Sequence, residues 1–324
     1  MQQVLRGCPV LTRSLTVRVP GAVGPAVQQR RNVESAPQGF FQSLADSYPV
    51  QQTQSLLESI HEVSGLPWWA SIGLTTVLLR TTITLPLTVY QHKIFARLEN
   101  IRQEMKDLLP EMKAETAIAI KKFNWDEKQA KSAFSRSMKK QFNQRVVRDN
   151  CHPLKSTVVI WAQLPMWVCL SVSLRNMAAA TEASAVPAQI TFLELTQGGC
   201  LWIPNLTVPD ASWILPVALG LINLAIVEMQ VATRTAKSGQ PPGKLQRYMT
   251  NFFRLVSVGM VPLAATVPSC MSLYWTVSST CGLAHNLVIM SPKFRRLVKV
   301  PKSPQELDNP YQNLVNHFRQ RLKL

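Results

Sequence analysis

Five apolar stretches, each about 16 to 24 residues long, alternate along the chain with charged segments. A helix of about 20 apolar residues is long enough to cross the hydrocarbon core of a bilayer. A buried helix of a soluble protein usually keeps a polar stripe, which these stretches lack. The pattern predicts an all-α membrane protein with five transmembrane helices. The stretches are 67–90, 156–177, 213–232, 252–267 and 270–290.

The last two stretches are separated only by Pro268 and Ser269, which predicts a tight hairpin of two rather short helices.

The charged segment 91–150 has a helical repeat of its own. Apolar residues recur there with spacings of three and four, first over 94–112 and then over 130–146. This periodicity predicts two antiparallel helices packed along their apolar seams, with a kink at Pro110, rather than a disordered basic loop. The seams comprise Ile94, Leu98, Ile101, Met105, Leu108 and Met112 in the first half, and Ala130, Phe134, Met138, Phe142 and Val146 in the second.

The charges between the stretches predict an orientation. Segment 91–155 holds 15 Lys and Arg against 8 acids, 233–250 holds 4 against none, and 291–324 holds 8 against 2. Segment 178–212 holds no Lys or Arg and 3 acids. Because basic loops stay on the inner side, the first three segments share that side and the last faces outward. This requires five spans, with the N-terminal segment outside and the C-terminus inside, and the parity agrees with the five apolar stretches.

The first 33 residues resemble a mitochondrial transit peptide, since five arginines occur there among Ser, Thr and Val without an acid. We therefore expect residues 1–33 to be removed, the inner membrane to be the destination, and the matrix to be the inner side. In the following segment, 34–66, Pro49 is expected to open an amphipathic helix with Leu56, Leu57, Ile60 and Val63 on one face, lying along the outer interface. Residues 291–324 would form a short matrix tail.

The six cysteines show no spacing typical of a disulfide framework or a zinc site. Cys200 and Cys270 both fall on the predicted outer side, which leaves a bridge between them open. We expect no metal and no cofactor.

Arg80 is the unusual residue of the first stretch. It lies about ten residues from the inner end, or roughly 15 Å deep at 1.5 Å per residue. An arginine at mid-bilayer costs about 2.5–3.5 kcal/mol on insertion scales. The spans contain a single acid, Glu228, which is too shallow to be an obvious partner and has Arg234 nearby.

Water is the remaining partner for Arg80, because other spans bring polar residues to a similar depth. Each of these residues could also have a structural role, such as bonding to its own backbone or joining two helices. Together they predict a hydrated groove, open to the matrix and carrying one positive charge. The predicted groove residues are Arg80, Thr76, Thr84, Gln163, Asn223, Ser278 and Ser279.

Such a groove suits a transient anionic guest, for example an acidic unfolded segment that must cross outward. The membrane potential, negative in the matrix, favours that movement by about 2.3 kcal/mol per charge per 100 mV. The groove would lower the remaining dehydration barrier by shortening the dry path.

Several motifs resemble those of the YidC/Oxa/Alb family of membrane protein insertases. They are the run from Pro67 through Arg80 to Pro86, the basic hairpin, DNCHPLKSTVVIWAQLPMW at 149–167, LWIPNLTVPDASWILP at 201–216 and VPSCMSLYW at 267–275. The resemblance covers about 60–310 and looks closest to the mitochondrial cytochrome c oxidase assembly branch. It implies a five-helix insertase core, a groove open to lipid and to the inner side, and the groove arginine at Arg80.

The resemblance also implies partners. The client would be cytochrome c oxidase subunit 2, whose acidic tail and adjoining helix would be exported, and other oxidase assembly factors would take part in the bilayer. The tail after Pro292 is only about 32 residues long, so we expect no stable ribosome binding. We expect no enzymatic reaction and no nucleic-acid partner.

Four other functions stay open at this stage. A general mitochondrial insertase would have broader clients. A small-anion transporter usually has internal repeats, which are not evident here. An intramembrane protease would need a nucleophile, and His285 has no evident partner of that kind. A passive assembly scaffold would leave the cost of burying Arg80 unexplained.

Overall fold

The computed structural model describes residues 39, 42–179, 186–238 and 243–322. The predicted presequence, residues 1–33, lies outside them. The chain divides into two units, Met1–Asp46 and Ser47–Leu324. Everything below concerns the second unit.

Every regular element of the described residues is a helix, which confirms the all-α prediction. The elements are α2 (Tyr48–Ser64), α3 (Trp68–Leu79), the π-turn η1 (Arg80–Thr84), α4 (Leu85–Phe123), α5 (Glu127–Arg148), the 3₁₀ turn η2 (Pro153–Thr157), α6 (Val158–Ala178), α7 (Val186–Gln197), α8 (Ile214–Ser238), α9 (Lys244–Thr266), α10 (Ser269–Met290), α11 (Pro292–Leu297) and α12 (Pro310–Leu322).

Three helices of the described residues are long and apolar enough to cross a membrane: Trp68–Phe123, Pro153–Ala178 and Ile214–Ala236. They contain the first three predicted spans. Helices α9 and α10 lie at the fourth and fifth, with 23 and 22 residues, but they are less apolar. Helix α9 begins eight residues earlier than the predicted span, with a polar first half, and α10 is rich in Ser and Thr. The count of five spans therefore stays a prediction.

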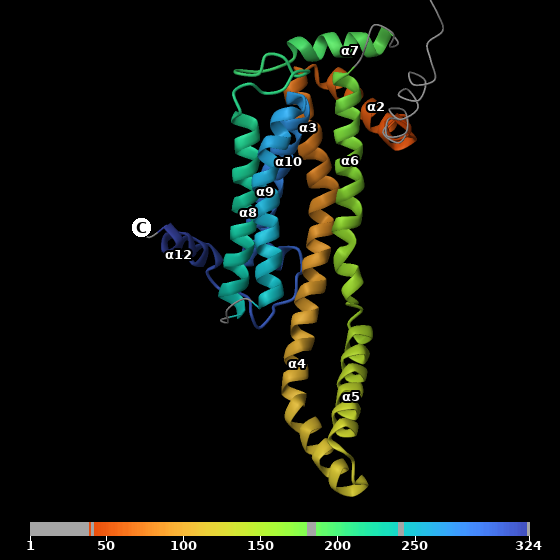
Figure 1. The fold of residues 1–324 in the computed structure, drawn as a ribbon, viewed down its shortest axis with the longest axis vertical. Coiled ribbons are helices and arrows are strands. Elements are labelled where there is room, and N and C mark those ends of the chain that lie inside the picture. The colour runs from red at the N-terminus through yellow and green to blue at the C-terminus, as the bar shows by residue number, and fades with distance from the viewer. Residues whose placement is uncertain (1–38, 40–41, 180–185, 239–242, 323–324) are drawn as a thin grey trace, which may run out of the picture. The chain divides into compact units, whose positions relative to one another are not determined.

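The helix of the first predicted span continues well beyond its expected end at residue 90. Helices α3 and α4 are joined through η1 into one continuous helix of 56 residues, Trp68–Phe123. Its second half forms the predicted hairpin with α5, and α4 bends in its C-terminal part, the part that contains Pro110 (Figure 1). Asn124 ends α4 in the left-handed conformation, and Asp126 opens α5 with a capping box.

The hairpin packs along the seams that the periodicity predicts. Residues of both seams form one cluster, in which Ile101 is fully buried and Val146 is 4% exposed. Cys151 joins the same cluster just beyond α5. Beyond the cluster, Met112 and Ala130 are also buried.

Helices α8, α9 and α10 run alongside α3 and α6, and α7 lies across one end of this bundle (Figure 1). The hairpin of α4 and α5 projects from the opposite end. We call these the cap end and the hairpin end.

Residues 198–213 complete the cap end with a tightly packed loop. The backbone N–H groups of Ser269 and Cys270, at the start of α10, donate to the carbonyls of Val208 and Leu206. Within the loop, Gly199 lets the chain fold back closely on itself, because a Cβ there would lie 1.9 Å from the Ile203 carbonyl oxygen. Helix α7 was not predicted. Cys200 and Cys270 are free cysteines, so they form no bridge.

The main apolar core fills the cap end of the bundle. It is built from the cap-end turns of α3, α6, α8, α9 and α10, together with α2 and α7. The helix opened by Pro49, α2, packs here through Leu57, which is 1% exposed, and Ser173 of α6 donates a hydrogen bond to the Val50 carbonyl. Val63 of the predicted apolar face is instead 90% exposed. The cap end of the bundle is therefore densely packed, whereas the pockets described below lie toward the hairpin end.

The hairpin seam yields a stability prediction. Replacing fully buried Ile101 with alanine should lower the hairpin's stability by about 2–5 kcal/mol, because it removes packed methyl groups and leaves a cavity. Hydrogen exchange across α4 and α5 measures the effect. Ile118→Ala is the matched control on the same helix, since Ile118 is 65% exposed. Equal loss of protection in both variants would contradict the packed seam.

Candidate functional site

Arg80 lies in the interior of the bundle, at the first residue of the π-turn. Its exposed fraction is 7%. The Arg80 carbonyl accepts a bond from the N–H of Leu85, five residues on. A π-turn inside an α-helix is rare and is often found at functional sites. Pro86 follows directly in the first turn of α4.

Ser278 of α10 is the direct partner of Arg80. The Arg80 Nε donates to the Ser278 Oγ at 2.9 Å, and one terminal nitrogen also contacts this oxygen. Tyr274 and Cys281, on the same helix, lie close enough to interact electrostatically with the guanidinium. No described acidic residue forms an ion pair with Arg80. Its hydrogen-bond partner is a neutral hydroxyl, which does not neutralise the positive charge.

The Arg80–Ser278 pair lies at the border of the packed core. Leu79 and Val277, the residues just before each member of the pair, pack against the core cluster. On the core side of Arg80, Thr76 is 2% exposed and donates its hydroxyl to its own helix, at the Ile72 carbonyl. The guanidinium therefore lies at the edge of the packed half of the bundle.

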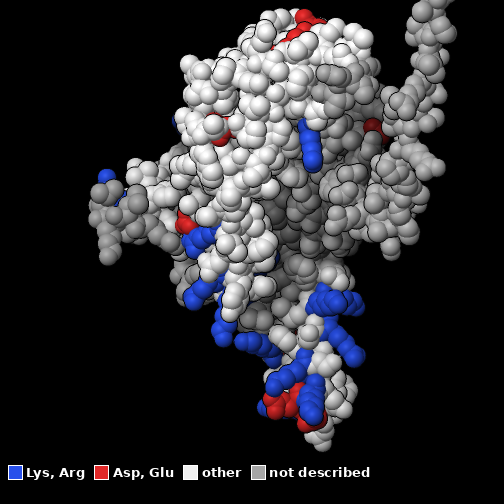
Figure 2. All heavy atoms as spheres, turned by 45° about the horizontal axis from the view of Figure 1, so that its top comes forward, with Lys and Arg blue, Asp and Glu red and all other residues white. Residues whose placement is uncertain are grey.

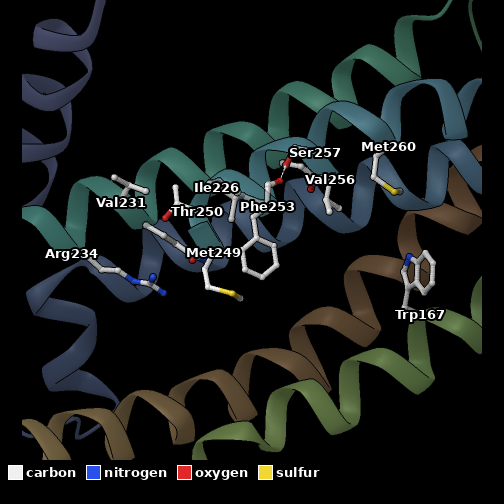
Figure 3. Close-up of a pocket in the computed structure, with 13 residues that line it drawn as sticks. Trp167, Ile226, Val231, Arg234, Met249, Thr250, Phe253, Val256, Ser257 and Met260 are labelled. Atoms are coloured by element: carbon white, nitrogen blue, oxygen red, sulfur yellow. Dashed lines mark hydrogen bonds between the residues drawn. The ribbon is translucent and has the colours of Figure 1, made fainter. Parts of the chain in front are cut away.

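A pocket of about 440 Å³ opens between α8, α9 and α6. We call it the α8–α9 pocket. Figure 3 shows Arg234, Met249, Phe253 and Met260 directed into the space that faces Trp167. Apolar side chains dominate this lining. The lining residues are Trp167, Asn223, Ile226, Val227, Gln230, Val231, Arg234, Met249, Thr250, Phe253, Val256, Ser257 and Met260.

The core closes one end of the α8–α9 pocket. Trp167 and Met260 line the pocket and also pack against the core cluster. Trp167 stacks on Trp275 of α10 at 5.6 Å between ring centroids, and the Trp275 indole donates to Ser171. This fixed aromatic pair forms a floor between the pocket and the cap end.

A second pocket, also about 440 Å³, lies where the hairpin meets the bundle. We call it the hairpin-end pocket. Arg234 lines both pockets, so the two adjoin at this residue. Figure 2 shows blue Lys and Arg side chains gathered toward the hairpin, while the cap side of this face is almost uncharged. The lining residues are His92, Phe95, Ala96, Leu98, Glu99, Arg102, Phe142, Pro153, Ser156, Arg234 and Arg295.

Glu228 pairs with Arg254 of α9, not with Arg234. The Arg254 Nε lies 2.6 Å from the Glu228 Oε1, and the side chains are 29% and 18% exposed. Arg234 forms no ion pair with any described residue. The interpretation that Arg234 could pair locally with Glu228 was wrong, because the packing of α9 against α8 brings Arg254 to the Glu228 carboxylate instead.

The structure brings only some of the predicted groove residues together. Arg80 and Ser278 are in contact with each other but line neither pocket described above, whereas Asn223 lines the α8–α9 pocket. Thr84 is 6% exposed within the π-turn. Gln163 and Ser279 are half-buried, and neither lines a pocket described above. Three residues that line these pockets were not predicted from the sequence: Arg102, Trp167 and Arg295. Only the long-range packing of the helices brings them to the pockets.

A model of the family described as "60Kd inner membrane protein" matches residues 59–296. The chain belongs to this family. It is the YidC/Oxa family of membrane insertases, as the sequence motifs indicate.

Mitochondrial relatives match nearly the whole chain. "Cytochrome c oxidase assembly protein COX18, mitochondrial" of Mus musculus is 42% identical over 327 residues, 97% of this chain and 96% of the relative. The protein of the same name from Homo sapiens is 42% identical over 86% of this chain and 82% of its own. "Mitochondrial inner membrane protein OXA1" of Arabidopsis thaliana is 28% identical over 91% of this chain and 60% of its own length.

The tail of this YidC/Oxa-family chain, which follows the matched residues 59–296, folds back on the bundle. Arg295 and Arg296 of α11 both bind Glu306, whose side chain is 7% exposed, and Asn100 of α4 donates to the Lys302 carbonyl. Burial by itself would raise the pKa of Glu306, but the hydrogen bond from Arg296 and the charges of both arginines lower it on balance. Glu306 therefore stays ionised and closes the tail onto the hairpin end.

A Ser–His–Glu arrangement occurs at the cap end. The His61 Nδ1 lies 3.2 Å from the Ser71 Oγ, and its Nε2 lies 3.6 Å from a Glu194 carboxylate oxygen. Ser71 is fully buried, however, and its hydroxyl also donates to the Leu66 carbonyl. A substrate has no access to this oxygen, so the cluster fastens α7 to α2 and α3 and gives no support to a protease.

The Glu228–Arg254 pair yields a second stability prediction. Glu228→Gln should cost about 1–3 kcal/mol, between the values typical of exposed and buried pairs. The thermal midpoint in detergent, taken through a double-mutant cycle with Arg254→Gln, measures the coupling. The exposed pair of Glu127 with Lys131 is the control, and Glu127→Gln should cost less than about 0.5 kcal/mol. Zero coupling between Glu228 and Arg254 would contradict the pairing.

Proposed function

We propose that this protein is a mitochondrial inner-membrane insertase that acts in cytochrome c oxidase assembly. It would move an acidic hydrophilic segment and the adjoining transmembrane helix from the matrix to the intermembrane space. The buried Arg80, which is hydrogen-bonded to a hydroxyl and has no acidic partner among the described residues, is the observation that carries this proposal.

The proposed orientation places the hairpin end in the matrix and the cap end in the intermembrane space. The hairpin, the 233–250 connection and the tail hold the excess of basic residues, and the cap segment 178–212 has no Lys or Arg. All three basic segments lie at the hairpin end of the bundle. With five spans, formed by the α3–α4 helix, α6, α8, α9 and α10, the chain would enter the first span from the intermembrane space and end in the matrix.

The energetics of Arg80 support a hydrated recess. A guanidinium at mid-bilayer costs about 2.5–3.5 kcal/mol on insertion scales, and one hydroxyl acceptor uses only part of its five donors. A purely structural role would be served better by an apolar residue. A carboxylate of a passing client would supply the missing partner, so the site favours an anionic guest over an empty state.

The two pockets suggest the path. They adjoin at Arg234 and lie on the hairpin side of the Trp167–Trp275 floor, while the cap side is a packed core. A segment could therefore enter from the matrix and advance partway through the membrane. Only the cap-end half would then remain to be crossed, with the membrane potential contributing about 2.3 kcal/mol per negative charge per 100 mV.

The client and partners come from the family resemblance and the relatives. Relatives covering most of this chain are named cytochrome c oxidase assembly proteins. We propose oxidase subunit 2, with its acidic C-terminal tail, as the client, and other oxidase assembly factors as partners. A general mitochondrial insertase is the alternative within the family. Export of several unrelated mitochondrially made proteins by the purified chain would favour that alternative.

Two functions of other classes make different predictions. A small-anion transporter would take up a labelled anion in liposomes that contain the purified protein, whereas an insertase would not. A passive scaffold would tolerate neutral replacement of Arg80. The Arg80 experiment below therefore separates the insertase from the scaffold.

Arg80→Lys and Arg80→Ala should differ in export. Lysine keeps a cation in the recess, so we expect it to retain most export of the subunit 2 tail, while alanine should lose about tenfold or more, the equivalent of one charge-assisted hydrogen bond. Protease protection of the tail in isolated mitochondria measures export. Thr82→Ala, on an exposed position of the same turn, is the control. Equal export by the lysine and alanine variants would show that the positive charge at position 80 plays no part in export.

A further inference from the structure

We propose that the hairpin-end pocket is a separate docking site for carboxylate side chains of an extended acidic peptide segment, and that Glu306 of the protein's own tail competes for it. The inference rests on the proposed insertase function and adds a step before Arg80. It concerns a pocket outside the membrane-embedded recess, lined by residues that the sequence analysis did not single out.

The first observation is the charge of the pocket. Arg102, Arg234 and Arg295 line it together, from α4, α8 and α11, against the one carboxylate of Glu99. Among the described residues, neither Arg102 nor Arg234 forms an ion pair, and both are exposed. Three cations from separate helices converge here, and two of them, Arg102 and Arg234, have no ion-pair partner among the described residues, which is the arrangement that a carboxylate-bearing ligand would neutralise.

The second observation is that a peptide carboxylate is already bound at the edge of this pocket. Glu306 reaches Arg295, at 3.4 Å between Glu306 Oε1 and Arg295 Nε, and contacts Arg296 as well. It comes from the non-helical segment between α11 and α12, just after a turn in which the Glu306 N–H donates to the Ser303 carbonyl, so an acidic side chain on a non-helical segment fits the site. Its presence favours an acidic peptide over a lipid headgroup as the ligand.

The third observation is continuity. Arg234 lines both the hairpin-end pocket and the α8–α9 pocket, which ends at the Trp167 floor. A carboxylate bound at Arg102 and Arg234 would lie at the opening of the α8–α9 pocket. The docking site would thereby raise the local concentration of the acidic segment at the start of its path.

Crosslinking tests the docking site directly. A photoreactive phenylalanine derivative replaces Phe95, which lines the pocket and is 46% exposed. The full-length protein in liposomes is titrated with a soluble 20-residue peptide rich in Asp and Glu, and in parallel with its Asn/Gln counterpart. We expect crosslinks to the acidic peptide only, decreasing as salt screens the charges.

Paired variants give the sharpest comparison. Arg102→Gln with Arg234→Gln should weaken crosslinking about tenfold or more, and Arg102→Lys with Arg234→Lys should retain most of it. Arg136→Gln with Lys140→Gln removes the same charge from exposed positions of α5 and should change it less than twofold. Glu306→Gln should increase crosslinking severalfold, because it frees Arg295.

The contrary outcomes are equally definite. Equal crosslinking of the acidic and neutral peptides, an equal effect of the two glutamine double variants, or crosslinks to lipid in place of peptide would overturn the docking site. A decrease with Glu306→Gln would overturn the competition. If the docking variants bind and export normally while Arg80→Ala still blocks export, the proposed docking site would be wrong and the proposed insertase function would remain supported. Failure of wild-type protein to export would overturn the proposed function, whatever the peptide binds.

Discussion

The hydrogen bond from Arg80 to Ser278 is the interaction on which the proposed mechanism depends. It positions a permanent cation inside a helical bundle with a neutral partner and no described acid. A carboxylate in place of Ser278 would satisfy the guanidinium and leave nothing for a client to bind. A hydroxyl fixes the side chain and leaves its charge uncompensated. Glu228, the single acid of the predicted spans, pairs with Arg254.

The bundle is tightly packed at the cap end and contains pockets toward the hairpin end, and this asymmetry would decide from which side a guest reaches Arg80. The apolar core, α7 and the 198–213 loop close the cap end, and the stacked pair of Trp167 and Trp275 marks where the packing stops. Both pockets described here lie on the other side, toward the basic hairpin. A guest drawn to Arg80 would therefore arrive from the hairpin end, where the tail residue Glu306 already holds two arginines.

The features that could be predicted from sequence are those encoded in local periodicity. The seam of Ile94 to Met112, the helix opened by Pro49 and the buried Arg80 all follow from residues a few positions apart. Helix α7 was missed because its short apolar run lies in a polar segment. The partner of Glu228, and the meeting of Arg102 with Arg234, depend on how separate helices pack, and a single sequence carries no record of that packing.

Water access to the α8–α9 pocket, on the hairpin side of the packed core, is the most direct measurement. Asn223 lines the α8–α9 pocket, and Leu219, one turn nearer the cap end on the same helix, is 1% exposed in the core. In a cysteine-free background, a membrane-impermeant maleimide applied at the hairpin side should label Asn223→Cys rapidly and leave Leu219→Cys unlabelled. A dry, unlabelled Asn223→Cys, or equal labelling of both positions, would contradict a recess that admits water only partway through the membrane.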